Sequence, residues 1–68
     1  MKVVPIIAFQ EELRRQVALY NSLGCSVYRD VNGSHYLVTE SIEKLPLSST
    51  NLVFEIANIP VHWIRVAG

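Results

Sequence analysis

The feature that most constrains the fold of this chain is the dipeptide Asn32-Gly33, which separates two runs rich in β-branched and aromatic residues. The first run begins at Cys25 and the second ends at Glu40. Asn and Gly both tolerate the positive φ angles of a type I′ turn, so this dipeptide is a strong short-range signal for a β-hairpin. We therefore expect residues 25–40 to form an antiparallel hairpin at the centre of the fold.

The register of this hairpin decides which side chains share a face of the sheet. With a two-residue loop, Asp30 opposes His35 and Tyr28 opposes Leu37, and directly opposed residues point to the same side. These four residues then form one mixed face. The opposite, more aliphatic face is expected to meet a helix and carries Cys25, Val27, Arg29, Val31, Tyr36 and Val38. A three-residue loop with Gly33 in a bulge would shift the register and change both faces.

Upstream of the hairpin, residues 9–23 carry the clearest helical pattern of the chain. Apolar side chains recur there at spacings of three and four residues, which is typical of an amphipathic helix. This stripe consists of Phe9, Leu13, Val17, Tyr20 and Leu23. Gly24 follows as a residue that commonly ends a helix in the left-handed conformation. We expect one helix over residues 9–23.

A short strand is expected before this helix, over residues 3–7, where β-branched residues predominate. Pro5 lies in its middle and cannot donate a hydrogen bond to a neighbouring strand, which favours a position at the edge of the sheet. The alternative is that Pro5 begins the helix, where its missing N–H is harmless.

The C-terminal third of the sequence is less regular. Residues 52–57 are almost uniformly apolar, and periodicity alone does not separate a buried strand from a short buried helix. Capping candidates at positions 48–51, together with Asn58 and Pro60 beyond the run, favour a second short helix near residues 50–58. Residues 61–66 alternate with a period of two and are expected to form a final strand.

These elements predict a single small α+β domain over residues 1–68. In it, one amphipathic helix packs on a small antiparallel sheet built around the central hairpin. A chain of 68 residues buries a modest core. Its one cysteine, Cys25, excludes an internal disulfide and favours a buried, reduced thiol in a cytoplasmic protein. We expect no membrane segment, because no apolar run approaches the roughly 20 residues that span a bilayer.

The candidates for catalysis and metal binding are few. Asp30 and His35 are the one proposed carboxylate–imidazole pair, and Ser34 points to the other face of its strand. His35 and His62 lack a metal-ligand spacing, and no glycine-rich phosphate loop is present. We expect no metal site and no cofactor. A formal net charge of zero also argues against broad nucleic-acid binding, which needs a basic surface.

A second interpretation starts from Leu23-Gly24 after the helix, the strand that contains Arg29, and the tripeptide Gly33-Ser34-His35. This stretch resembles the start of the HicA-type mRNA interferase toxins. In that family a helix leads into a hairpin with a Gly-Ser-His element, on a fold like that of double-stranded-RNA-binding domains. The resemblance implies that His35 is the catalytic residue and that residues 49–59 form the closing helix of the family.

One helix covers one face of a sheet, and the other face needs a cover of its own. We therefore expect a non-enzymatic interaction or regulatory protein that binds a protein partner or a second copy of itself. The contact would use the uncovered sheet face or the edge at residues 61–66. This is the profile of small regulators and inhibitors, including those of phages. The alternative is a HicA-like toxin or another small RNA-binding module that uses His35. The candidate binding residues are Tyr28, Asp30, His35, Leu37, Trp63 and Arg65.

Overall fold

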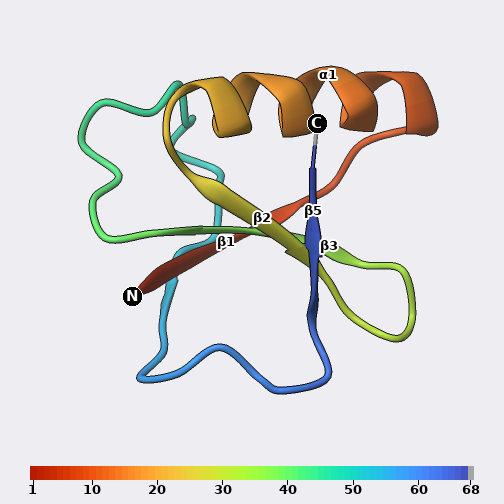
Figure 1. The fold of residues 1–68 in the computed structure, drawn as a ribbon. Helices are drawn as coiled ribbons and strands as arrows, with labels where there is room; N and C mark the ends of the chain where they lie inside the picture. The colour runs from red at the N-terminus through yellow and green to blue at the C-terminus, as the bar shows by residue number, and fades with distance from the viewer. Residues whose placement is uncertain (68) are drawn as a thin grey trace.

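The computed structural model describes residues 1–67, in which one helix lies over one face of a five-stranded antiparallel sheet (Figure 1). The strand order is β4-β1-β3-β2-β5. The elements in chain order are β1 (Lys2–Ile6), α1 (Gln10–Ser22), β2 (Ser26–Arg29), β3 (His35–Thr39), β4 (Phe54–Glu55) and β5 (Ile64–Val66). The α+β architecture expected from the sequence is confirmed.

Strands β1 and β2 run parallel to each other because both pair antiparallel with β3, which lies between them. Helix α1 connects them, so β1, α1 and β2 form a split β-α-β unit. The expectation that β1 lies at a sheet edge is wrong, since β4 pairs with its other side. That pairing involves only Lys2 and Val3. The β4 side of β1 is therefore open at Pro5, where proline removes no hydrogen bond to β4.

The central hairpin forms, but its loop is longer than the type I′ turn that the sequence predicts. Arg29 opposes His35 and Tyr28 opposes Tyr36. The Asp30 N–H donates to the Ser34 carbonyl over 3.0 Å, which leaves a three-residue loop. Gly33 alone takes a positive φ in this loop, at 83°. The geometry is thus the bulged alternative, and the predicted pairing of Asp30 with His35 is wrong.

The shifted register places Val4, Val27 and Leu37 on the helix side of the sheet, where each is at most 2% exposed. They form the core with Val17 and Tyr20 of α1. The predicted helix over residues 9–23 is confirmed: α1 ends at Ser22, Leu23 is its C-cap, and Gly24 follows with a φ of 83°. The observed bounds lie within one residue of those expected at each end.

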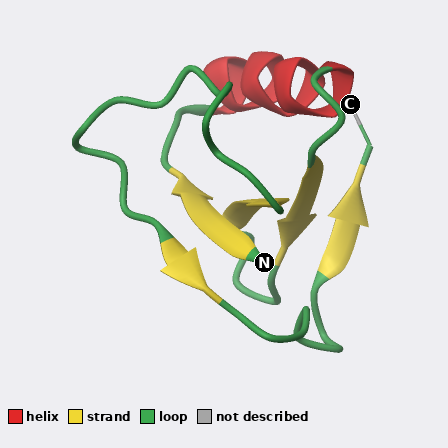
Figure 2. Ribbon diagram, turned by 90° about the vertical axis from the view of Figure 1, so that its left-hand side faces the viewer, coloured by secondary structure: helices red, strands yellow, loops and turns green. Residues whose placement is uncertain are grey.

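The face of the sheet opposite the helix is also partly covered. The connection between β4 and β5, residues 56–63, passes below the sheet on the side away from α1 (Figure 2). Val3 and Val38 point to this side and are only 3% and 5% exposed. The sequence suggested that the face opposite the helix is uncovered. In the structure, residues 56–63 partly cover it.

The expected second helix near residues 50–58 is wrong, because residues 54–55 form β4 instead. The same finding removes the closing helix implied by the resemblance to HicA-type toxins. The capping candidates are used within a turn of their own: the Asn51 side chain accepts a hydrogen bond from the Ser48 N–H over 2.7 Å. The final strand is shorter than predicted and begins at Ile64.

Candidate functional site

The predicted binding residues lie on both faces of the sheet. Tyr28 and Arg65 oppose each other across β2 and β5 and share the face opposite the helix. His35 and Leu37 belong to the helix side, where Leu37 is fully buried. The face that Tyr28, Asp30, His35 and Leu37 were expected to share therefore does not exist, because the three-residue loop shifts the pairing of β3 with β2 by one residue. That they bind a partner stays a prediction.

Asp30 organises the hairpin turn. One carboxylate oxygen accepts hydrogen bonds from the N–H groups of Asn32 and Ser34, over 2.9 and 3.0 Å. The other accepts a 3.0 Å hydrogen bond from the Tyr36 hydroxyl. Desolvation raises the pKa of Asp30, but these hydrogen bonds and the charge of His62 outweigh it, so the pKa lies below its usual value. Asp30 is thus an ionised side chain that holds the loop.

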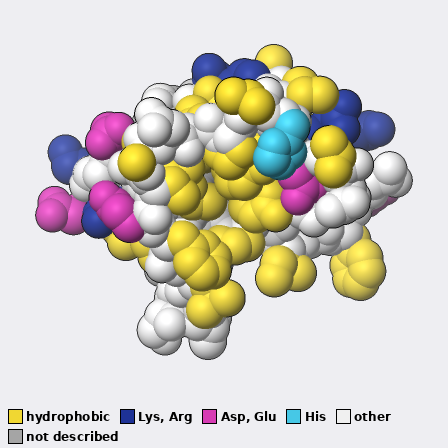
Figure 3. Space-filling model, turned by 90° about the horizontal axis from the view of Figure 1, so that it is seen from below, with side chains coloured by type: hydrophobic (Ala, Val, Ile, Leu, Met, Phe, Trp, Pro, Cys, Tyr) yellow, Lys and Arg dark blue, Asp and Glu magenta, His cyan; other side chains and the backbone are white. Residues whose placement is uncertain are grey.

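Three aromatic side chains gather beside this turn, on the face opposite the helix. The rings of Tyr36 and Trp63 stack in parallel, with centroids 4.3 Å apart and an interplanar angle of 3°. Tyr28 lies 6.5 Å from Trp63, and the Arg65 guanidinium lies 6.0 Å from the centroid of Tyr28. Figure 3 shows hydrophobic side chains gathered over the middle of this face. The stack fastens the 56–63 connection to the sheet.

His35 does not form the proposed carboxylate–imidazole pair. Its Nδ1 lies 2.9 Å from the Gly33 carbonyl oxygen, so the ring donates its proton there. Asp30, the expected partner, is engaged by the loop and Tyr36. The arrangement of residues around His35 thus lacks the acid–base pair that the sequence suggested.

Among residues 1–67, no three His, Cys, Asp or Glu side chains lie close enough together to hold a metal ion. Cys25 is a buried free thiol, as expected. Within the same residues, no helix is long and apolar enough to cross a membrane.

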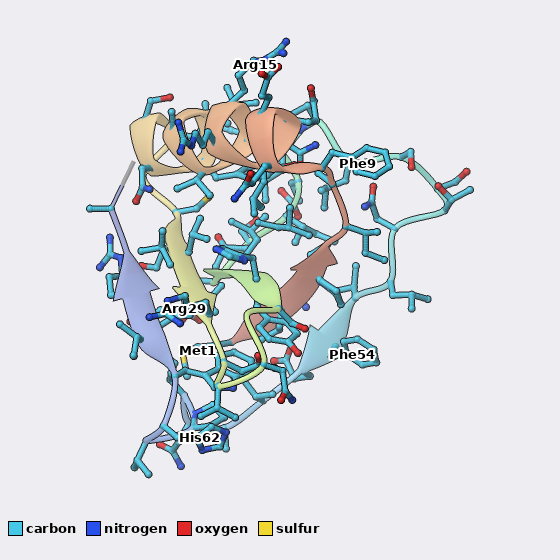
Figure 4. The ribbon with its side chains drawn as sticks, turned by 90° about the vertical axis from the view of Figure 1, so that its right-hand side faces the viewer. Met1, Phe9, Arg15, Arg29, Phe54 and His62 are labelled. Atoms are coloured by element: carbon cyan, nitrogen blue, oxygen red, sulfur yellow. The ribbon has the colours of Figure 1, made fainter. Side chains whose placement is uncertain are left out.

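Sequence reasoning missed a different surface, at the β4 edge of the sheet. Four large apolar side chains lie exposed there: Ile7 (91%), Phe9 (91%), Leu52 (62%) and Phe54 (51%). Ile7 connects them, because it lines one hollow with Leu52, another with Phe54 and a third with Phe9. We call these four residues the apolar edge surface. Figure 4 shows Phe9 and Phe54 on the same side of the molecule, away from β5.

Phe9 was expected in the buried stripe of the helix, and that assignment is wrong. It is the N-cap residue of α1, with an extended backbone, and its side chain caps no helical N–H. Ser, Thr, Asp or Asn at this position would satisfy one of those donors. A signal was available in the sequence, because Ile7 and Phe9 stand at alternate positions in the segment directly before the helix. It was overlooked because Phe9 also fits the helical spacing of Leu13 and Val17.

The β4 strand that borders this surface is an open edge. It pairs with β1 on one side and has no strand on the other among the described residues. Glu55 faces the N-terminal ammonium group over 3.5 Å and the Lys2 amine over 3.6 Å. The acidic side chain of this strand is therefore already balanced, and Phe54 stands beside it as an exposed aromatic ring.

Comparisons of this chain with protein-family models, with curated proteins and with solved structures give no match.

Proposed function

We propose that this chain is a non-enzymatic interaction protein that works as a homodimer, with the apolar edge surface as its interface. The observation that carries the proposal is the exposure of Ile7, Phe9, Leu52 and Phe54 next to an open strand edge. Contiguous exposed apolar side chains of this kind mark interaction sites in small proteins. Phe9 supports the proposal further. An aromatic N-cap residue accepts no hydrogen bond from a helical N–H and so lowers the stability of the helix, and a contact with a partner would explain its presence.

The surface area of the molecule supports an interface of ordinary size. A folded monomer of 7.7 kDa is expected to expose about 4,300 Å², whereas this chain exposes 4866 Å². The excess is roughly 500 Å², and a stable interface buries about 800 Å² on each partner. This excess is a property of the whole molecular surface, and it is of the same order as the area that one partner buries in such an interface.

A second copy of the chain suits this surface for two physical reasons. An open antiparallel edge pairs with its own copy about a two-fold axis, since the two strands then run antiparallel. The formal net charge of zero leaves no overall repulsion between copies. A buried reduced thiol fits a cytoplasmic protein. Small regulators and inhibitors commonly act as homodimers.

Sedimentation velocity from low micromolar to millimolar concentration tests the proposal. We expect the wild type to shift from monomer to dimer and Phe54→Asp to remain monomeric, because the carboxylate would be buried in the interface without a partner. Ile64→Asp is the matched control. Ile64 lies on the opposite edge strand, β5, and is 54% exposed, close to the 51% of Phe54.

The control variant should dimerise like the wild type. A wild type that stays monomeric at millimolar concentration would overturn the proposal. If Ile64→Asp abolished the dimer and Phe54→Asp did not, dimerisation would stand but its interface would be the β5 edge.

A further inference from the structure

A cleft of about 360 Å³ opens on the helix side of the sheet, between α1, β1 and residues 46–52. Its volume falls in the range of sites that bind small molecules. The cleft lies where the irregular chain after β3, and no second helix, covers this part of the sheet. The lining is apolar along β1 and at Leu37, and it is polar at Gln16, Tyr20 and within residues 48–51.

Tyr20 is the side chain that points to a ligand. The residue as a whole is 7% exposed, and its hydroxyl forms no hydrogen bond with another described residue. Among the described residues, every fully buried side-chain N or O atom has a hydrogen-bond partner. The Tyr20 hydroxyl has no such partner, so it is not a fully buried atom. The open space that Tyr20 lines is the cleft. Tyr20 therefore lines the cleft with a hydroxyl that is open to solvent and has no hydrogen-bond acceptor among the described residues.

The ionisation of Tyr20 fits a donor role. Desolvation by burial, followed by the nearby Cys25, raises the pKa of the Tyr20 hydroxyl above its ordinary value. The hydroxyl is protonated at neutral pH, as an ordinary tyrosine hydroxyl also is, and can donate a hydrogen bond to an acceptor.

The lining also limits what such an acceptor can belong to. None of the described residues that line the cleft is Lys, Arg, His, Asp or Glu. A charged ligand would lose its hydration without gaining a counter-ion, so a neutral molecule is favoured. An enclosed cavity of about 150 Å³ holds benzene, and this open cleft is roughly twice as large. One or two rings would fill it.

We propose that the cleft binds a small, uncharged molecule with one or two rings and a carbonyl-type acceptor that receives the Tyr20 hydroxyl proton. The rings would lie on the apolar floor formed by β1 and β3. Gln16 and Asn51 also line the cleft, but the Gln16 amide donates to Glu12 and the Asn51 side-chain oxygen accepts from Ser48. Ile7 and Leu52 border both the cleft and the apolar edge surface, so the proposed dimer would cover part of the rim of the cleft.

Benzamide tests this site as a neutral one-ring probe with a carbonyl acceptor. It is titrated into ¹⁵N-labelled protein at one fixed protein concentration and followed by NMR. We expect saturating shifts in residues of β1, the Gln16–Tyr20 turn of α1 and residues 48–52. Benzoate should bind more weakly than benzamide, because no basic side chain lines the cleft. Toluene should cause shifts in the same residues without using the hydroxyl.

Tyr20→Phe should weaken benzamide binding about three- to tenfold, the effect of one hydrogen bond, and leave toluene binding unchanged. Tyr28→Phe is the matched control, because it removes a hydroxyl from the opposite face of the sheet. Thr50→Trp repeats the test should Tyr20→Phe not fold, because a large ring on this exposed part of the lining would narrow the cleft and should weaken benzamide and toluene alike. Shifts that do not saturate, shifts that map to Tyr28 and Trp63, or a Tyr20→Phe protein with wild-type affinity would each overturn the proposal.

Discussion

At the scale of single residues, Asp30 holds the hairpin loop with both of its carboxylate oxygens. One oxygen binds two backbone N–H groups inside the loop, and the other binds the hydroxyl of Tyr36 on the next strand. A two-residue loop would place Asp30 in the ladder and forfeit these contacts. The side chain of one aspartate thus selects a three-residue loop over the type I′ turn that the Asn-Gly dipeptide indicates.

Gly33→Ala tests this loop geometry. The φ of Gly33 is +83°, and an added Cβ would meet nothing within 4 Å, so the cost of the substitution comes from the backbone alone. We expect a loss of about 1–2 kcal/mol in the free energy of unfolding, measured by urea denaturation. Asn32→Ala is the control and should change little, because Asn32 has a negative φ and contributes only its backbone N–H. Equal losses in both variants would indicate a type I′ turn instead.

At the scale of secondary-structure elements, local patterns predicted what depends on neighbouring residues. The stripe of α1 and the two runs around Asn32-Gly33 place one helix and one hairpin correctly, because both signals come from adjacent turns of chain. The second helix was mispredicted because its capping residues bond to one another: Ser48 donates to Asn51 by both its N–H and its hydroxyl. Pairing partners far along the chain then decide that residues 54–55 become β4.

The candidate surface was harder to predict than the fold. Phe9 fits the apolar period of α1, but its backbone is extended and it lies just before the first helical residue. Its direction depends on where the helix begins, and helix ends are the least certain part of a pattern. Leu52 and Phe54 join it only through the long-range pairing of β4 with β1. A contact between segments this far apart leaves no periodic pattern in the local sequence.

Phe9→Ser separates the two roles of this position. A serine hydroxyl can accept a hydrogen bond from a helical N–H, so we expect the monomer to gain about 1 kcal/mol in the free energy of unfolding. Urea denaturation at low micromolar concentration measures this gain. Phe9→Ala removes the same apolar ring without adding a cap and should not gain. A destabilised Phe9→Ser monomer would show that the ring packs within its own chain, contrary to its 91% exposure.

At the scale of the whole molecule, the sheet separates two environments. On one side α1 completes a core around Leu37, and on the other the stacked rings of Tyr36 and Trp63 fasten the chain that leads to β5. Both faces are therefore at least partly covered from within. Both edge strands, β4 and β5, lack a neighbouring strand on one side among the described residues, and the four residues of the apolar edge surface are the reason to seek the second copy at β4 and not on the sheet face.

If this edge pairs two copies, folding and association are linked, and the thermal midpoint must depend on protein concentration. A tenfold rise in concentration stabilises a dimer by about 1.4 kcal/mol, which is shared between two chains. For a chain of this size the melting temperature should then rise by roughly 3–6 °C per tenfold. Calorimetry or circular dichroism over a hundredfold range measures it. Ile64→Asp should keep this slope and Phe54→Asp should lose it, whereas a flat wild-type profile would mean that the edge stays unpaired in solution.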